Sequence, residues 1–172
     1  DMEEPAAGDL HRVGVIARIV QATRQANGTA RILVEGISRA RVTRYVPASG
    51  YLRAGLAEDP ETAAEDPAGL NVAARRVLAL FEEYVAQHRR LPSELVTLIQ
   101  SADSPARQAF GVAAHLGTNL DRRQGLLAIE DFPTFLRALG DALTSEIDLL
   151  RLERKIDEQS AKGVGMAGAQ VA

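Results

Sequence analysis

The feature that most constrains the fold lies near the N-terminus, where two alternating apolar runs flank Asn27-Gly28-Thr29. Asn-Gly is a strong hairpin signal because both residues tolerate the positive φ that a type I′ turn requires. Successive side chains of a strand point to opposite faces. The residues that share an apolar face are Val13, Val15, Ala17 and Ile19 in the first run and Ile32 and Val34 in the second. The pattern predicts two antiparallel strands with one face in a core.

Two further strands are expected after this hairpin. Gly36 interrupts the alternation, and a glycine inside a strand is typical of a bulge or corner that lets the chain bend. We expect a third strand from about Ser38 to Val46 and a short fourth one from Tyr51 to Ala57. The sequence therefore predicts an antiparallel β subdomain over residues 1–57.

An acidic linker is predicted over residues 58–69, because this stretch contains two prolines and no apolar periodicity. Beyond it, apolar residues recur at intervals of three and four, which predicts a helix from Leu70 to Gln87. The stripe on that helix consists of Leu70, Ala74, Val77, Phe81, Tyr84, Val85 and His88. Leu91-Pro92 should break the helix, because the residue before a proline disfavours helical geometry.

Short helices should fill the rest of a bundle over residues 70–130. Ser104 followed by Pro105 is typical of an N-cap with proline at the first helical position, and Gly117 is a natural stop for that helix. Asp121 and Gln124 have the spacing of a capping box, which predicts that the next helix opens there.

A long last helix is predicted over residues 131–159. Its apolar stripe consists of Phe132, Leu136, Leu139, Leu143, Ile147 and Leu150. The glycines between residues 163 and 168 oppose a helix, so residues 160–172 are expected to form a flexible tail. The fold class is therefore α+β, with an antiparallel β subdomain followed by a helical bundle and a long C-terminal helix.

Composition excludes several kinds of site. The 172 residues contain no cysteine and three scattered histidines, so neither a disulfide framework nor a zinc cluster is expected. No apolar run reaches the roughly 18 residues that span a bilayer, and the acidic start of the chain is unlike a signal peptide. We therefore expect no metal, no cofactor and no membrane partner, and a cytoplasmic location.

No catalytic signature is present either. The sequence contains no Walker A pattern. Glu82 and Glu83 are adjacent on a helix, so their carboxylates do not face each other. His88 and His115 have no nucleophile or acid at a diagnostic spacing, which favours structural roles for both. We assign this chain no catalytic residue.

Several segments, in order and spacing, resemble the N-terminal substrate-recognition domain of ATP-dependent Lon proteases. The segments are Leu10 to Gln21, Asn27 to Gly36, Arg39 to Val42, Phe81 to Val85, Leu91 to Leu95, Ala113 to Leu116 and Glu146 to Ile156. Together they cover residues 9–158. The resemblance implies a PUA-like sheet that is incomplete here, because family members place further strands before residue 9. It also implies a chain truncated at its N-terminus that lacks the motor and protease domains, with apolar sheet area left exposed.

The resemblance implies a non-catalytic domain that recognises substrates and helps assemble a Lon-type ATP-dependent serine protease, which degrades misfolded and regulatory proteins. The partners would be unfolded or tagged proteins, other copies of the chain in a ring, and the motor and protease modules of the parent protein. Either an apolar groove or the exposed sheet face would take extended client segments. Among single residues, we expect client contacts at Tyr45, Val46, Tyr51 and Leu52.

Two other functions stay open. PUA-type folds bind RNA elsewhere, and residues 10–55 contain eight arginines against a single acid, Glu35. The arginines are divided between strand faces, however, and few aromatic residues are available for base stacking, which argues against nucleic acid. A stand-alone oligomerisation domain is the third reading, and the glycine-rich end favours it.

Overall fold

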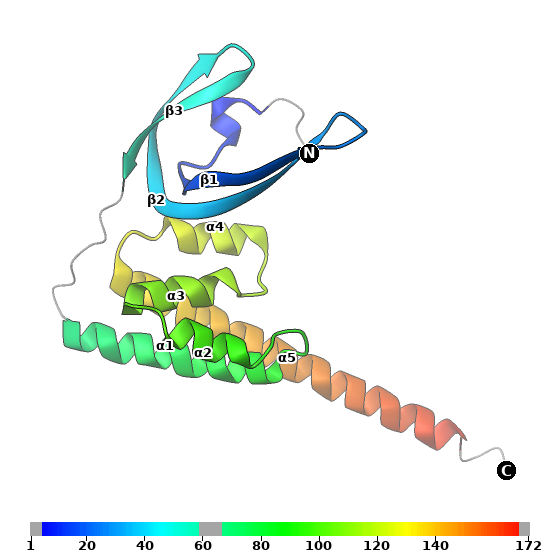
Figure 1. Ribbon diagram of the computed structural model, residues 1–172. Helices are drawn as coiled ribbons and strands as arrows, with labels where there is room; N and C mark the ends of the chain where they lie inside the picture. Colours follow the sequence, from blue (N-terminus) through cyan, green and yellow to red (C-terminus); the bar gives the residue numbers. More distant parts are fainter. Residues whose placement is uncertain (1–4, 59–66, 169–172) are drawn as a thin grey trace. The chain divides into compact units, whose positions relative to one another are not determined.

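The computed structural model describes residues 5–58 and 67–168 (Figure 1). The chain divides into two compact units, residues 1–63 and residues 64–172. Within the described residues, the first unit contains a short 3₁₀ helix and the strands, and the second contains the α-helices. The expected α+β class is confirmed.

The sheet unit consists of η1 (Ala7–Asp9) and three strands, β1 (Val13–Arg24), β2 (Ala30–Ala48) and β3 (Tyr51–Glu58). The strands form one antiparallel sheet in the order β1-β2-β3. The prediction of a separate third strand from Ser38 was wrong, because β2 runs continuously through 19 residues. Figure 1 shows β2 curving so that it lies beside β1 first and beside β3 afterwards.

A β-bulge explains how one strand serves both neighbours. Ile16 pairs with Ser38 and Ala17 pairs with Gly36, so Ile37 is an extra residue in β2. A bulge bends a strand and increases its twist without ending its ladder. The irregularity predicted at Gly36 is therefore real, but the chain bends there instead of starting a new strand.

The hairpin turn also differs from the expected type. Gly28 has a φ of 83°. In the described ranges no residue other than glycine has a positive φ, so the φ of Asn27 is not positive. The Gly28 N–H donates to the Gln25 carbonyl at 3.1 Å, and the Asn27 side chain accepts from the Thr29 N–H at 3.1 Å. The turn is therefore longer than a two-residue type I′ turn, which needs a positive φ at both central residues.

The helical unit contains α1 (Pro67–Gln87), α2 (Glu94–Gln100), α3 (Pro105–Ala114), α4 (Leu120–Ala128) and α5 (Phe132–Gly168). Helix α1 packs most extensively against α5 and then against α3. The buried cluster consists of Ala74, Val77, Phe81, Tyr84, Val85, Leu95, Ile99, Ala109, Val112, Leu116, Leu126, Phe135, Leu136, Leu139, Ala142, Leu143 and Ile147. The apolar residues of the predicted α1 and α5 stripes thus face this core, with Leu70, Phe132 and Leu150 partly buried at its rim. His88, which was predicted to belong to the α1 stripe, lies just after that helix and outside the cluster.

The helix starts follow cap chemistry. Ser104 caps α3 by accepting from the Arg107 N–H, as predicted. Helix α4 is capped by Asn119, which accepts from the Arg122 N–H at 2.9 Å, so the capping box expected at Asp121 was wrong and the cap lies two residues earlier. Asp131 accepts from the Thr134 N–H at 2.9 Å and starts α5 where expected.

Gly117 does not end a helix, because α3 already ends at Ala114. Its N–H instead donates to the Tyr84 hydroxyl at 3.0 Å, and a Cβ added to Gly117 would lie 2.8 Å from that oxygen. A side chain at position 117 would therefore displace the Tyr84 hydroxyl from its place.

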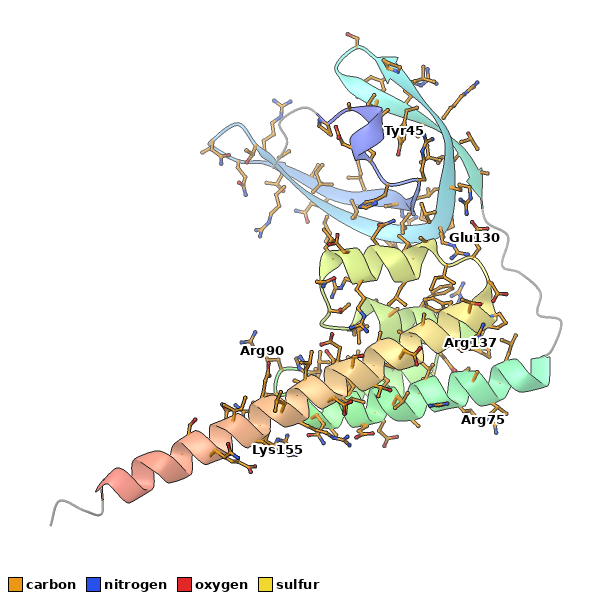
Figure 2. All side chains as sticks on the ribbon, turned by 180° about the vertical axis from the view of Figure 1, so that it is seen from behind. Tyr45, Arg75, Arg90, Glu130, Arg137 and Lys155 are labelled. Atoms are coloured by element: carbon orange, nitrogen blue, oxygen red, sulfur yellow. The ribbon has the colours of Figure 1, made fainter. Side chains whose placement is uncertain are left out.

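Helix α5 continues to Gly168, so the tail predicted from residue 160 was wrong for residues 160–168. Glycine lowers helix stability by about 1 kcal/mol per residue but does not by itself stop a helix. The side chains of Arg151 and Glu83 form an ion pair, and Arg89 pairs with Asp157 at 3.0 Å, so α5 is held along the C-terminal end of α1 (Figure 2).

The predicted linker of residues 58–69 lies largely outside the described residues. At its edges, β3 ends at Glu58 and α1 begins at Pro67. Proline is favoured in the first turn of a helix, where its missing N–H costs nothing. The helix therefore starts three residues before the predicted Leu70.

Candidate functional site

The sheet unit leaves most of its apolar side chains exposed. Within residues 5–58, the buried apolar residues are Val13 and Ala40. The large apolar side chains that are exposed there are Val15, Ile19, Val20, Ile32, Leu33, Val34, Ile37, Val46, Tyr51, Leu52 and Leu56. The prediction that one sheet face lies in a core was therefore wrong, whereas the expectation of exposed apolar sheet area is met. A contiguous exposed apolar surface is typical of a binding site.

One face of the β1–β2 hairpin is aliphatic. In the strand register, Ile19 lies opposite Val34, and Ile32 lies one alternation further along the same face of β2. Val15 is on this face too, because it lies four residues before Ile19 in β1. A Cβ added to Gly36 would lie 3.3 Å from the Val15 Cγ1, so the Val15 side chain covers Gly36. The exposed fractions are 51% for Val15, 62% for Ile19, 51% for Ile32 and 56% for Val34. We call these four residues the aliphatic face.

The opposite face of the same hairpin is mainly polar. Arg18 and Glu35 are cross-strand partners there and form an ion pair at 2.5 Å. A shallow hollow of about 340 Å³ is lined by Gln21, Thr23, Gln25, Arg31 and Leu33. The hairpin is therefore amphipathic, and in the described sheet unit no strand lies against its aliphatic face.

The four predicted contact residues do not form one surface. Val46 lies two positions before Ala48, the partner of Tyr51, so Val46 and Tyr51 share a face. Tyr45 and Leu52 lie on the other face by the same argument. The four residues are close in sequence, but the strand register places two of them on each face of the sheet.

Tyr45 already has structural partners. Its hydroxyl donates to the His11 carbonyl at 2.8 Å, and the Arg12 guanidinium lies 5.7 Å from the ring centroid (Figure 2). These contacts fasten the segment after η1 to β2. Tyr51, by contrast, is 65% exposed, and Val46 and Leu52 are 42% and 37% exposed.

A second apolar stripe lies on α5 beyond the packed core. Leu149, Leu152 and Ile156 are spaced by three and four residues and are 52–54% exposed. This spacing places them on one side of the helix. It is the pattern of a helix that packs against another helix.

Two histidines and a tyrosine of the helical unit have structural partners. The His88 Nδ1 accepts from the Arg90 N–H at 3.2 Å, and the His115 Nδ1 lies 2.9 Å from the Gly111 carbonyl oxygen. Burial raises the pKa of the Tyr84 hydroxyl, although the hydrogen bond from Gly117 partly offsets this. Neither histidine adjoins a nucleophile in these contacts, so the helical core has the features of a packing core.

Across residues 5–58 and 67–168, no group of three metal-binding side chains comes together. In the same part of the chain, no helix combines the length and apolarity needed to cross a bilayer.

Comparison with known proteins places the chain in a family. Residues 1–145 match the ATP-dependent protease La (LON) substrate-binding domain. Among curated proteins, the chain is 37% identical to the Lon protease of Xanthomonas oryzae pv. oryzae over 156 residues, and 34% identical to that of Escherichia coli over 160 residues. These alignments cover 91% and 93% of the chain but only 18% and 20% of those proteins. The chain thus spans about a fifth of the length of the relatives that it matches.

A solved structure of a Lon N-terminal domain has a similar fold. The N-terminal domain of the Mycobacterium avium complex Lon protease superposes with a TM-score of 0.62 at 28% identity, covering 77% of this chain and 70% of that one. The family match covers both the strands and most of the helices. The chain belongs to the family of substrate-binding domains of ATP-dependent Lon proteases.

Proposed function

We propose that this chain recognises substrates for a Lon-type ATP-dependent serine protease, and that the aliphatic face of the β1–β2 hairpin binds extended apolar segments of unfolded proteins. The observation that carries the proposal is the exposure of Val15, Ile19, Ile32 and Val34 on one side of an amphipathic hairpin. A folded client buries its alternating apolar strands, whereas an unfolded client offers them to this surface.

The expected mechanism is binding without bond breaking. Fully burying a valine or isoleucine side chain stabilises a complex by about 1.5–3 kcal/mol, and the ordering of the client cancels much of that gain. Each site is therefore weak. Several copies in one assembly raise the effective concentration of sites and still release the client as it is pulled away.

We also propose the wider context of the chain. The parent protein would carry motor and protease modules, act on misfolded and regulatory proteins, and work in the cytoplasm. The stripe of Leu149, Leu152 and Ile156 on α5 supports pairing with another copy in a ring, because apolar residues at this spacing suit helix–helix packing.

Tyr51 and Val46 are proposed as a secondary contact surface, because they share a face and are both exposed. Tyr45 and Leu52 are retained only as minor candidates, since Tyr45 is half-buried and held by His11, and Leu52 is the least exposed of the other three.

The test measures binding of residues 1–172 to reduced, carbamidomethylated α-lactalbumin and to its native form. Tighter binding of the unfolded form is expected. Replacing Ile19 and Val34 together by threonine should weaken that binding by about tenfold or more, since two apolar contacts are lost.

Leu33→Thr is the matched control, because Leu33 is 57% exposed on the opposite face of the same strand. Equal affinity for native and unfolded protein would argue against a recognition role. An equal loss in the Leu33 variant would argue against the aliphatic face as the site.

A further inference from the structure

We infer that an extended client segment binds by adding to the sheet as an antiparallel strand, along the outer edge of β1 between Val15 and Ile19. This inference rests on the proposed function, because it specifies how the chain holds the segments that its aliphatic face is proposed to recognise. Its basis is the open side of β1, where the backbone groups that point outward belong to residues with side chains on that face.

The register of the β1–β2 ladder shows which backbone groups of β1 point away from β2. The Val42 N–H donates to the Arg12 carbonyl at 2.7 Å, so these two residues form a hydrogen-bonded pair. In an antiparallel ladder, hydrogen-bonded pairs alternate with pairs that exchange no backbone bonds. The alternation continues along β1 to Ile19, because the first bulge lies in β2. The N–H and C=O groups of Val15, Ala17 and Ile19 therefore point outward.

These outward groups lie on an open edge. In the described sheet, β1 has β2 as its single neighbour (Figure 1). Among residues 5–58 and 67–168, the hydrogen bonds outside the ladder involve no backbone group of Val15, Ala17 or Ile19. Such an edge presents donors and acceptors in a repeat of about 7 Å, which is two residues of an extended strand. Another extended polypeptide offers the same repeat, whereas a phosphate offers acceptors alone.

The side chains of the same three residues share one face. Val15 and Ile19 belong to the aliphatic face, and Ala17 lies between them with the same orientation. An added antiparallel strand would place every second side chain on that face, beside these residues. Its other side chains would lie on the opposite face, beside the ion pair of Arg18 and Glu35. The segment that fits therefore alternates apolar and polar residues.

The open part of the edge is bounded at both ends. Val13 is 6% exposed and has an interaction of its own within the protein. Val20 is an extra residue in β1, where the register with β2 shifts after Ile19. A bulge bends a strand and disrupts its ladder, so pairing should end there. The edge therefore accepts about six residues, or roughly 20 Å of extended chain.

The edge of β1 suits a client better than the other edge of the sheet. Strand β3, at that other edge, has 8 residues against 12 in β1 and lies outside the hairpin that carries the aliphatic face. A segment on β3 would depend mainly on backbone hydrogen bonds, each of which contributes little in water. A segment on β1 gains the same bonds together with apolar contacts.

The test uses the unmodified 172-residue chain and three peptides of equal apolar content. In the parent peptide, valine alternates with threonine over the six central residues, and each end is Gly-Ser. In antiparallel pairing, residues directly opposite each other share a face, so the valine N–H groups point toward β1 and the threonine N–H groups point away. The second peptide has N-methyl groups on two valine nitrogens, and the third has them on two threonine nitrogens.

Fluorescence anisotropy measures the binding of each labelled peptide. Methylation of the valine nitrogens should weaken binding by about tenfold or more, because it removes two hydrogen bonds to the edge of β1. Methylation of the threonine nitrogens should change the affinity by less than about twofold, because those N–H groups stay in water.

Ala17→Pro tests the edge from the side of the protein. The Ala17 N–H points outward, so proline removes a donor from the open edge and leaves the bonds to β2 in place. Binding of the parent peptide should fall by about threefold or more.

Ala54→Pro is the matched control on β3. Ala48 and Tyr51 close a two-residue turn as a hydrogen-bonded pair, so Ala54, three positions later, also points outward. This variant should bind the parent peptide as the unmodified chain does. Hydrogen exchange in β2 reports whether both variants keep their ladders.

The outcomes separate the two proposals. If the three peptides bind equally, side chains alone hold the segment, so strand addition is overturned and the recognition function stands. If none binds, the recognition function itself fails. A loss on threonine methylation in place of valine methylation would overturn the antiparallel pairing. A dimer seen by sedimentation, and dissociated by Ala17→Pro, would assign the edge to a second copy and overturn the inference.

Discussion

The two units of this chain use their apolar residues in opposite ways. In the helical unit, Phe81, Leu139 and Leu143 are 0% exposed, and the predicted stripes meet inside one core. In the sheet unit, Ile19 and Val34 are 62% and 56% exposed, although the apolar residues of both strands alternate as a buried face would. The comparison teaches that apolar periodicity indicates an amphipathic element, whereas burial depends on what covers it.

The two units therefore differ in what stabilises them. The helical unit gains its stability from side-chain burial, which contributes roughly 25 cal/mol per Å² of apolar area. The described sheet unit has little buried side-chain area and depends more on its backbone ladder. Large-to-small substitutions should therefore act on stability in the helical unit and on binding in the sheet unit.

The largest expected effect is that of Leu139→Ala in the helical core. Removing this fully buried side chain should lower the free energy of unfolding by about 2–5 kcal/mol, measured by urea denaturation followed by circular dichroism. Leu149→Ala on the same helix is the control, because Leu149 is 52% exposed. A comparable loss in both variants would break the contrast between buried and exposed leucines.

Gly117→Ala should have the next largest effect. Its Cβ would lie 2.8 Å from the Tyr84 hydroxyl oxygen, so the tyrosine would have to move, at a cost of about 1–3 kcal/mol. The counterpart in the sheet unit is Gly14→Ala, where no atom lies within 4 Å of the added Cβ. Hydrogen exchange of peptides from α1 and from β1 reports each unit separately. Strong destabilisation by Gly14→Ala would show that the sheet unit is packed as tightly as the helices.

A smaller effect on stability is expected from Ile19→Thr with Val34→Thr. Both side chains are exposed, and threonine is well tolerated in strands, so stability should change by less than about 0.5 kcal/mol per site. The measurement is hydrogen exchange in β1 and β2. Loss of protection comparable to that caused by core substitutions would mean that these residues serve the fold and not a partner.

The smallest effect concerns pH and Asp131. Hydrogen bonds from the Thr134 side chain and backbone lower the pKa of Asp131 below its ordinary value of 3.8. Because the folded-state pKa is the lower one, the carboxylate stabilises α5 above pH 3.8, and that contribution is lost as the pH falls through the folded-state pKa.

Asp131→Asn should make the acid side of the pH–stability curve shallower, because asparagine caps a helix without titrating. Urea midpoints measured from neutral pH to below 3.8 test this. Asp141→Asn, which removes an exposed acid inside α5, is the control. An unchanged curve in Asp131→Asn would rule out this carboxylate as a source of acid sensitivity.

The helical core could be predicted because its partners lie within the chain. A stripe such as Leu136, Leu139, Leu143 and Ile147 needs a facing stripe, and α1 supplies one. Helix α2 was not predicted, because its seven residues are too few to show a helical period. The hairpin position was predicted but its turn type was not, since Asn-Gly also fits a turn in which only the glycine has a positive φ.

The candidate site was harder to predict. Alternation identifies an apolar face without saying whether anything covers it, so Ile19 and Val34 were assigned to a core. The contact residues Tyr45, Val46, Tyr51 and Leu52 were chosen by type and position along the chain. Bulges such as that at Ile37 reset which residues share a face, and such register shifts depend on pairing between distant segments.

The amphipathic hairpin also has a cost for the protein that carries it. Strand β1 lies at an edge of the sheet. An uncovered edge beside aliphatic side chains can pair with strands of other molecules and so promote aggregation. Arg24, on that strand, acts as a gatekeeper because its charge would repel the same charge on a second hairpin, whereas the charge of Arg18 is paired with Glu35. A charged side chain on the edge strand thus opposes aggregation of neighbouring copies through the hairpin that exposes the aliphatic face.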